Sequence, residues 1–184
     1  MQMIASTSQL RAELIRWSLV LCPGIVLLGF LSATVGSSGP DNPWFVALAK
    51  PAINPPPIAF PIVWTALYIM MGFALALVVT ASGARGRRLA VGMFVAQLAL
   101  NLAWSPLFFG LHRIWAGLML IIVLDLVAIG TVVLFAKVRK AAAWLMVPYI
   151  AWLLFASLLN WQFWQMNPLA DGQRSSGAVT KIEF

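Results

Sequence analysis

Side-chain amides recur in this sequence within long apolar segments. Gln97 and Asn101 lie four positions apart in one such segment. A helix turns by about 100° per residue, so this spacing places both amides on one face, together with Trp104 and Phe108. Amides are costly to leave in lipid, and we expect these two to face protein or a cavity. In the alternative interpretation they only connect helices, with hydrogen bonds of roughly 0.6 to 2 kcal/mol each.

Two further segments combine aromatic and polar side chains on one face. The face between residues 141 and 166 contains Tyr149, Trp152, Ala156, Asn160 and Phe163. The face between residues 60 and 81 contains Trp64, Tyr68 and Met71. Three such faces have the composition of a pocket for a flat, largely apolar ligand. The residues alone favour this pocket and an aromatic core with a few buried hydrogen bonds equally.

Residues for acid–base or metal chemistry are scarce. The chain has five acidic residues and one histidine, His112, and no Ser-His-Asp set, carboxylate pair, phosphate loop or metal motif is visible. Asp125 lies within an apolar segment, where an ionisable group suggests function, but a single carboxylate does not make a proton relay. We therefore expect no catalytic residues, no metal site and no required cofactor.

The composition is that of an integral membrane protein. Of its residues, 62% are hydrophobic and 9% are charged, whereas a soluble domain has about 25% charged residues. The apolar runs are long enough for helices that cross a core of about 30 Å, and the short alternating segments of a membrane barrel are not seen. The net charge of +7 comes from basic residues between these runs, which indicates orientation in the membrane rather than nucleic-acid binding.

The sequence predicts an all-α bundle of five transmembrane helices in a single domain, residues 1–166. The expected spans are 14–35, 60–81, 89–111, 114–136 and 141–166. The first is longer than the apolar part of a signal peptide, so we expect it to be retained. A polar tail, 167–184, is expected to be mobile.

The loop between the first two spans, residues 36–59, is rich in proline, which fixes φ and makes the loop stiff. Trp44 is expected at the membrane interface, where aromatic rings are favoured. Lys50 is one of only two charged residues in this loop.

Basic residues are distributed unequally between the two sides of the predicted bundle. The side of the N-terminus has eight, namely Arg11, Arg16, Arg85, Arg87, Arg88, Lys137, Arg139 and Lys140. The other side has four, Lys50, Arg113, Arg174 and Lys181. This difference predicts a cytoplasmic N-terminus and places the proline-rich loop outside.

The third span also has a narrow stripe of small residues, about 140° from its amides. The stripe consists of Gly92, Ala96, Ala99 and Ala103. Small residues at this spacing let two helix backbones approach closely. The partner is either another helix of the same bundle or the same stripe of a second copy in a homodimer.

Three blocks of residues, in order, resemble the translocator protein (TspO/MBR) family, which includes bacterial tryptophan-rich sensory proteins and mitochondrial peripheral-type benzodiazepine receptors. The first block is Trp44…Leu48-Ala49-Lys50-Pro51…Pro55-Pro56…Phe60…Trp64-Thr65-Ala66-Leu67-Tyr68. The second is Gln97…Asn101…Trp104…Pro106…Phe108-Phe109-Gly110. The third is Pro148-Tyr149…Trp152…Phe155-Ala156…Leu159-Asn160. The resemblance covers about residues 15 to 166.

This resemblance implies a five-helix fold, usually dimeric, with a cavity below the first loop for porphyrins, haem-like tetrapyrroles and synthetic isoquinoline or benzodiazepine ligands. The proline-rich loop, with Pro51, Pro55 and Pro56, would be its lid. By motif position the pocket residues would be Trp64, Tyr68, Asn101, Trp104, Trp152, Ala156 and Asn160. The resemblance favours the pocket over the aromatic core.

The sequence departs from the family pattern at two places. Many bacterial members have tryptophan shortly after the Pro-Pro pair, and this residue has been linked to light-driven porphyrin breakdown; here the position is Ile58. Animal members end the fifth helix with a proposed cholesterol motif, whereas the segment from Leu159 to Gln165 has neither its tyrosine nor its basic residue. We therefore do not predict sterol binding.

Three functions stay open at this point. The first is a receptor or carrier for tetrapyrroles, the second a light- or oxygen-dependent porphyrin-degrading enzyme, and the third a regulatory membrane protein acting through partners or lipid. The first is preferred, with Lys50 as a candidate cation for the ligand's propionates. Helical spans favour a bacterial inner membrane, and bacterial or mitochondrial outer membranes are the alternatives.

Overall fold

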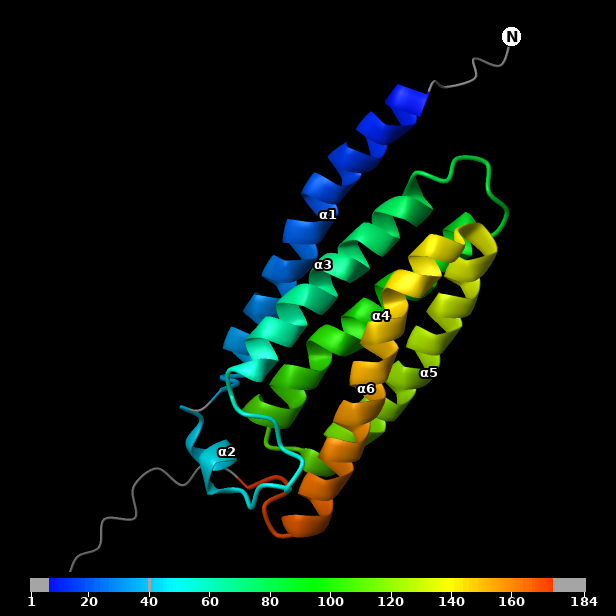
Figure 1. Ribbon diagram of the computed structural model, residues 1–184. Helices are drawn as coiled ribbons and strands as arrows, with labels where there is room; N and C mark the ends of the chain where they lie inside the picture. Colours follow the sequence, from blue (N-terminus) through cyan, green and yellow to red (C-terminus); the bar gives the residue numbers. More distant parts are fainter. Residues whose placement is uncertain (1–6, 40, 174–184) are drawn as a thin grey trace, which may run out of the picture.

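The computed structural model describes residues 7–39 and 41–173 of the chain. Within these residues, five helical segments are long and apolar enough to cross a membrane. They are α1 (Thr7–Val35), α3 (Ala59–Val79), α4 (Arg87–Ser105) with its continuation η1 (Pro106–Gly110), α5 (Ile114–Val138) and α6 (Lys140–Met166). The predicted all-helical fold with five spans is confirmed (Figure 1).

The helix ends lie within two residues of the predicted ends, with one exception. Helix α1 begins at Thr7 instead of near residue 14. Its first two turns contain polar and basic residues that an apolar run does not include, but a helix satisfies its own backbone wherever it leaves the hydrocarbon. The third span ends in η1, a π-helical turn that starts at Pro106.

The proline-rich loop contains a short helix, α2 (Pro43–Ala47), that was not predicted. Its start has a clear local cause. The Asn42 side chain accepts a hydrogen bond of 2.9 Å from the backbone N–H of Phe45, and Pro43 occupies the first helical position, as is common at helix starts. The Asn42 amide also donates to the carbonyl of Phe109 at 3.2 Å, which attaches the loop to η1.

The spanning helices form a closed ring in the order α1, α3, α6, α5, α4, with a further contact between α3 and α4. Helices α4, α5 and α6 are joined by short connections and pack as neighbours, whereas α3 contacts α6, which lies far along the chain. This order lets α3, α4 and α6 face one another (Figure 1).

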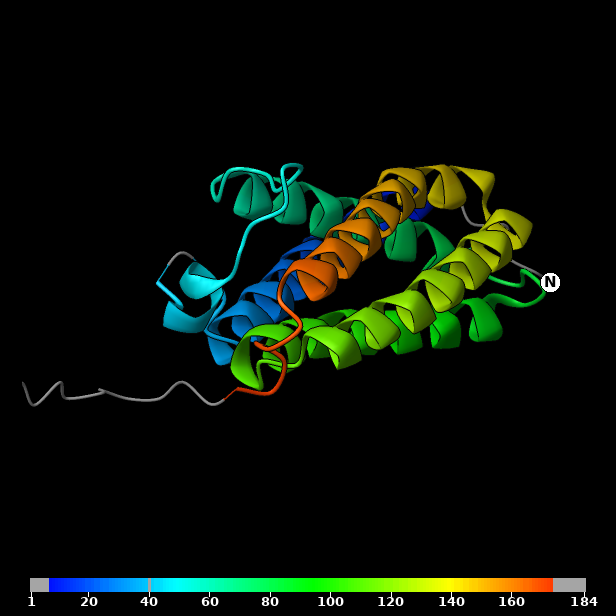
Figure 2. The same ribbon diagram turned by 90° about the horizontal axis from the view of Figure 1, so that it is seen from below.

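The two ends of the bundle differ in their chemistry. The loop with α2, the η1–α5 junction and residues 167–173 meet at one end, as Figure 2 shows. The start of α1, the α3–α4 loop and the α5–α6 junction lie at the opposite end (Figure 1). The eight basic residues counted above on the side of the N-terminus all belong to this second end, which we call the basic end.

Helices α1 and α3 approach each other closely because glycines lie at their crossing. A Cβ on Gly29 of α1 would lie 2.0 Å from Cε2 of Tyr68. A Cβ on Gly72 of α3 would lie 2.7 Å from Cα of Cys22. Neither distance is compatible with a real side chain, so both glycines are required by the packing and Gly29 fixes the position of the Tyr68 ring.

Candidate ligand-binding site

Three half-buried tryptophans lie on the helices that face one another: Trp64 on α3, Trp104 on α4 and Trp152 on α6. All three pack against the main apolar core while part of each ring stays uncovered. The Trp64 ring lies 5.2 Å from that of Tyr68, centroid to centroid. Ala156, one turn beyond Trp152, is also half-buried. Each of the three rings therefore keeps an uncovered part, and a small residue lies beside Trp152.

Four buried polar side chains connect these helices through consecutive hydrogen bonds. The Tyr68 hydroxyl donates to Oδ1 of Asn101 at 2.9 Å. The Asn101 amide donates to the Tyr149 hydroxyl at 3.2 Å, and that hydroxyl donates to Oε1 of Gln97 at 2.7 Å. All the bonds run in one direction. The Gln97 amide nitrogen at the far end is buried and has no partner among the described residues.

This chain of hydrogen bonds joins three of the predicted faces. The sequence placed Gln97 and Asn101 on one helix face and left open whether they line a pocket or only connect helices. Both are buried and both connect helices. The Tyr68 ring, at this end of the chain of hydrogen bonds, lies beside Trp64, and its hydroxyl oxygen accepts no hydrogen bond from the described residues. It can therefore accept one from a ligand.

A second polar contact lies nearer the loop. The Trp104 indole N–H donates to Oδ1 of Asn160 at 3.3 Å, and the Asn160 amide donates to the Ile114 carbonyl at 3.0 Å. Gly117 of α5 leaves the space for this contact, because a Cβ there would lie 3.3 Å from Oδ1 of Asn160 and 3.5 Å from the Trp104 nitrogen. Trp104 is thus fixed on one side and stacked on Phe108, 4.8 Å away, on the other.

The space directly below the loop is filled by a second apolar cluster. Its buried members are Trp44, Leu48, Phe108, Ile114, Leu159 and Phe163. Trp44 stacks on His112 at 4.6 Å and meets the edge of Phe108 at 5.5 Å. Its indole N–H donates to the Ala170 carbonyl at 3.2 Å. Trp44 thus anchors the loop in protein, whereas the sequence suggested the membrane interface.

The segment after α6 fastens the loop from the other side. Oδ1 of Asn167 accepts from the Ala49 N–H at 2.8 Å, and the Asn167 amide donates to the Ala49 carbonyl at 3.0 Å. Asp171 accepts from the N–H of Ile114 at 2.6 Å and so caps α5. Residues 167–173 are therefore attached to the protein, unlike the mobile tail expected for 167–184; residues 174–184 lie outside the described residues.

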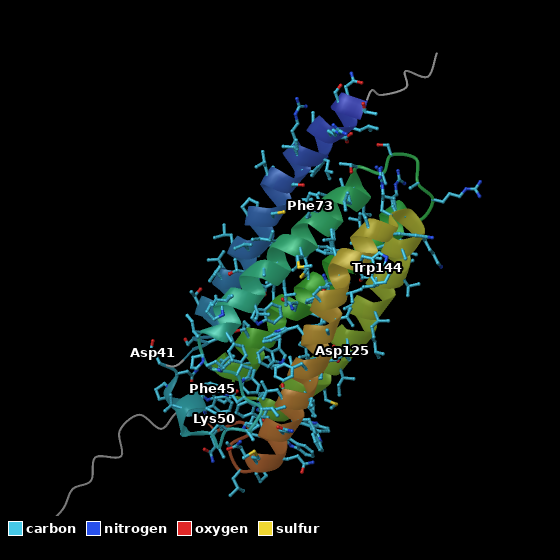
Figure 3. All side chains as sticks on the ribbon, viewed as in Figure 1. Asp41, Phe45, Lys50, Phe73, Asp125 and Trp144 are labelled. Carbon is cyan, nitrogen blue, oxygen red and sulfur yellow. The ribbon has the colours of Figure 1, made fainter. Side chains whose placement is uncertain are left out.

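Lys50 does not point its charge at the half-buried tryptophans. Its ammonium group donates to the carbonyls of Phe45 and Leu48 and lies 4.1 Å from the centre of the Phe45 ring. Burial lowers the pKa of this ammonium group below its ordinary value. The lysine thus holds the turn after α2 together. Figure 3 shows Lys50 beside Phe45.

The prolines of the loop differ in exposure. Pro51 is buried, Pro55 is half-buried and Pro56 is exposed. Ile58, just after them, is 66% exposed. The loop therefore covers the bundle mainly through α2 and the segment around Pro51.

Asp125, midway along α5, has a partner on α6. Its Oδ2 accepts a hydrogen bond of 2.7 Å from the Ser157 hydroxyl, while its Oδ1 is buried without a partner among the described residues (Figure 3). This contact joins α5 to α6.

Comparison with known proteins agrees with this geometry. The model of the TspO/MBR family matches residues 19–165, which include three of the spans in full and most of α1 and α6. This chain belongs to the TspO/MBR family. It is 44% identical over 154 residues to the tryptophan-rich protein TspO of Chlorobaculum tepidum, covering 82% of this chain and 96% of that protein.

Relatives occur in animals as well as bacteria. The chain is 37% identical over 168 residues to the translocator protein of Ovis aries, covering 90% of this chain and 94% of that protein. It is 36% identical over 135 residues to the tryptophan-rich sensory protein of Cereibacter sphaeroides, covering 73% of this chain and 84% of that protein. The family assignment made from three sequence blocks is confirmed.

The small-residue stripe of this TspO/MBR protein lies on the outside of the bundle. Gly92, Ala96, Ala99 and Ala103 are all exposed, and a Cβ on Gly92 would meet nothing within 4 Å. The stripe therefore does not pack within the five-helix bundle, which was one of the two interpretations of the sequence. Lipid or a second copy covers it.

Several residues that shape the site were not singled out from the sequence. Asn42 had the clearest signal, because asparagine followed by proline is typical of a helix start. Gly29 and Gly117 lie in apolar runs where glycine has many roles, and no pattern marks their partners. Asn167 and Asp171 lie in a polar segment, and their partners are far away in the sequence.

Proposed function

We propose that this TspO/MBR protein is a membrane receptor or carrier that binds porphyrin or a related tetrapyrrole between α3, α4 and α6. The observation that supports this most is the set of half-buried rings Trp64, Trp104 and Trp152 on three facing helices. A flat macrocycle needs such rings, because stacking on an aromatic side chain adds about 0.5–1.5 kcal/mol beyond the burial of area.

The polar groups beside these rings suit a ligand with a few central or peripheral polar atoms. The Tyr68 hydroxyl has a free acceptor position, and its own hydrogen is committed to Asn101. It can therefore accept a hydrogen bond from a pyrrole N–H. The acidic groups of a tetrapyrrole would stay at the aqueous rim, since the Lys50 ammonium is held by two carbonyls.

Entry of such a ligand requires the loop to move. The cluster below the loop is closely packed, and α2 and residues 167–173 hold it in place. We therefore propose that the loop acts as a lid whose opening admits the ligand. The names of two relatives, a translocator protein and a sensory protein, fit transport and sensing respectively.

We further propose that the protein works as a homodimer joined through α4. The exposed stripe of Gly92, Ala96, Ala99 and Ala103 supports this, because small residues let two helices pack closely in a membrane. The basic end would face the cytoplasm, with the N-terminus on that side. A bacterial inner membrane is the proposed location.

Titration with protoporphyrin IX in the dark tests the binding proposal. The Soret band should shift saturably with the wild-type protein, and Trp152→Ala should weaken binding by about fivefold, the loss of one stacking contact. Trp144→Ala is the matched control, because Trp144 lies on the same helix, near the basic end, and is 73% exposed (Figure 3). Equal affinity for all three proteins would contradict the proposed site.

The same samples distinguish a receptor from a degrading enzyme. Illumination should leave the bound porphyrin spectrum as stable as in buffer with free tryptophan, because an exposed isoleucine occupies position 58. Bleaching above that control, which Trp144→Ala retains and Trp152→Ala loses, would instead favour the enzyme.

A further inference from the structure

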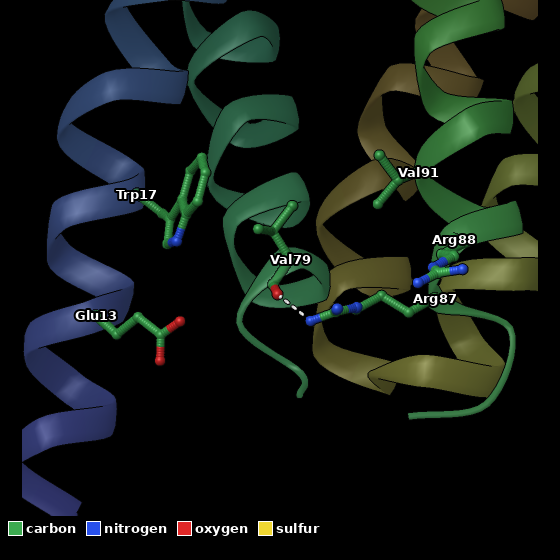
Figure 4. Close-up of a pocket in the computed structure, with 6 residues that line it drawn as sticks. All are labelled: Glu13, Trp17, Val79, Arg87, Arg88 and Val91. Carbon is green, nitrogen blue, oxygen red and sulfur yellow. Dashed lines mark hydrogen bonds between the residues drawn. The ribbon is translucent and has the colours of Figure 1, made fainter. Parts of the chain in front are cut away.

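A cavity of about 450 Å³ opens at the basic end of the bundle, away from the candidate ligand-binding site. Its walls come from three helices that are separate in the sequence. Glu13 and Trp17 belong to α1, Val79 is the last residue of α3, and Arg87, Arg88 and Val91 belong to the start of α4 (Figure 4). We call this the α1–α4 cavity.

The two arginines of the cavity are not neutralised by the protein. Arg87 donates to the Val79 carbonyl at 2.9 Å, a neutral partner at the end of α3. Arg88 is exposed, and neither arginine forms an ion pair with Glu13 or another acid in the described part of the chain. Figure 4 shows the Glu13 carboxylate on the opposite wall. The lining charges sum to +1, so the cavity favours an anion.

The remaining walls are apolar. Trp17 is 40% exposed, and Val79 and Val91 are half-buried. Tryptophan is favoured at the level of the lipid headgroups. The cavity thus combines cations at the membrane surface with apolar side chains toward the hydrocarbon. A phospholipid has the matching arrangement, an anionic headgroup followed by acyl chains, whereas a free anion has no apolar part.

Helix α1 is little covered by the other described helices. Only 11% of the residues in its most apolar window are buried. A second cavity, of about 510 Å³, lies on the opposite side of α1 and has an apolar lining, with Arg11 among its residues and Phe73 of α3 on its other wall (Figure 3). Cavities thus flank α1 on both sides near the basic end.

We propose that the α1–α4 cavity binds an anionic phospholipid with a hydroxylated headgroup. Its phosphate contacts Arg87 and Arg88, its headgroup hydroxyl donates to Glu13, and an acyl chain lies along Trp17, Val79 and Val91. The bound lipid connects α1 to α4 where the protein itself leaves them apart. This site is independent of the proposed porphyrin site, because the two share no residue.

The test measures lipid binding to the purified, delipidated full chain by native mass spectrometry. Phosphatidylglycerol should bind more tightly than phosphatidylcholine. Arg88→Gln should lower the phosphatidylglycerol affinity about fivefold, the effect of one basic residue near an anionic surface. It should lower the phosphatidylcholine affinity less, because that lipid has the phosphate but no net negative charge. Arg85→Gln is the matched control, since Arg85 is an exposed arginine of the loop just before α4 and does not line the cavity.

Thermal unfolding without lipid should be the same for the wild type and for both variants. The side chains of Arg85 and Arg88 form no hydrogen bond or ion pair among the described residues. If Arg88→Gln and Arg85→Gln lowered the phosphatidylglycerol affinity equally, the proposal would be overturned. Such a result would indicate a diffuse electrostatic attraction of the lipid to the basic end. No preference for phosphatidylglycerol would overturn it as well, and so would displacement of the lipid by inorganic phosphate alone, which would indicate a free-anion site.

Discussion

The Asn167 side chain pairs with both backbone groups of Ala49, accepting at 2.8 Å and donating at 3.0 Å. The two residues are separated by 118 positions in the sequence. This pair is one of the contacts that fasten the proline-rich loop to the end of α6. The proposed lid is therefore held by a few identifiable hydrogen bonds, each of which can be removed separately.

Asn167→Ala should loosen the lid without unfolding the bundle. It removes the two hydrogen bonds to Ala49 and a third that the Asn167 amide donates to the Phe163 carbonyl, each of about 0.5–1.5 kcal/mol. The backbone hydrogen bonds of the spanning helices stay in place. Hydrogen–deuterium exchange should rise in residues 43–51 and stay unchanged in α5. Gln165→Ala is the control, because Gln165 is exposed on the last turn of α6. Unchanged exchange in the loop would show that α2 and Trp44 suffice to hold it.

Tyr149→Phe should destabilise the protein more than Tyr68→Phe. The first change removes two interhelical hydrogen bonds and leaves both Gln97 and Asn101 without a partner at that position, whereas the second removes one. Such bonds contribute about 0.6–1.7 kcal/mol each in membrane proteins. Thermal unfolding in detergent measures the difference. The chain of hydrogen bonds would be unsupported if Tyr68→Phe proved the more damaging change.

Gly29→Ala should disturb the crossing of α1 and α3, because its Cβ would overlap the Tyr68 ring. Overpacking of this kind costs about 1–3 kcal/mol. Gly24→Ala on the same helix is a close control, since a Cβ there meets nothing within 4 Å. The melting temperature should fall for Gly29→Ala and stay level or rise for Gly24→Ala. Similar melting temperatures for the two variants would mean that α1 can move away from α3 at this crossing without loss of stability.

Ala99→Leu should separate the proposed homodimer and leave the protomer folded. The added side chain would stand on an exposed stripe, so it meets the second copy and not the bundle. Light scattering in detergent should report the mass of a dimer for the wild type and of a monomer for Ala99→Leu. Ala151→Leu, on an exposed position of α6, should stay dimeric. If the wild-type protein were a monomer, the homodimer would be contradicted and the stripe would contact lipid.

The spans could be predicted well because each rests on a long apolar run, which the membrane requires of any crossing helix. The inward face of α4 followed from the spacing of Gln97 and Asn101 alone. Their partners did not, since periodicity places a residue on a face without saying which helix lies opposite. The ring order that brings Tyr68, Asn101 and Tyr149 together depends on packing between α3 and α6, which are far apart in the chain.

The loop and the end of the chain were the hardest parts to predict. Proline content predicts a stiff loop but not the short helix α2, which depends on a single capping residue, Asn42. The role expected for Lys50 as a cation for the ligand depended on its charge, while its actual position depends on two nearby carbonyls. Such short-range competition for donors and acceptors leaves no periodic trace in a sequence.

The most direct test of the proposed binding site is to fill it. Ala156 is half-buried beside Trp152, so Ala156→Trp would occupy the space of a flat ligand and keep every stacking residue. Ala151→Trp, which places the same bulk on an exposed position of α6, is the control. Saturable protoporphyrin binding should be lost in Ala156→Trp and retained in Ala151→Trp. Wild-type affinity in a folded Ala156→Trp protein would contradict a ligand site between α3, α4 and α6.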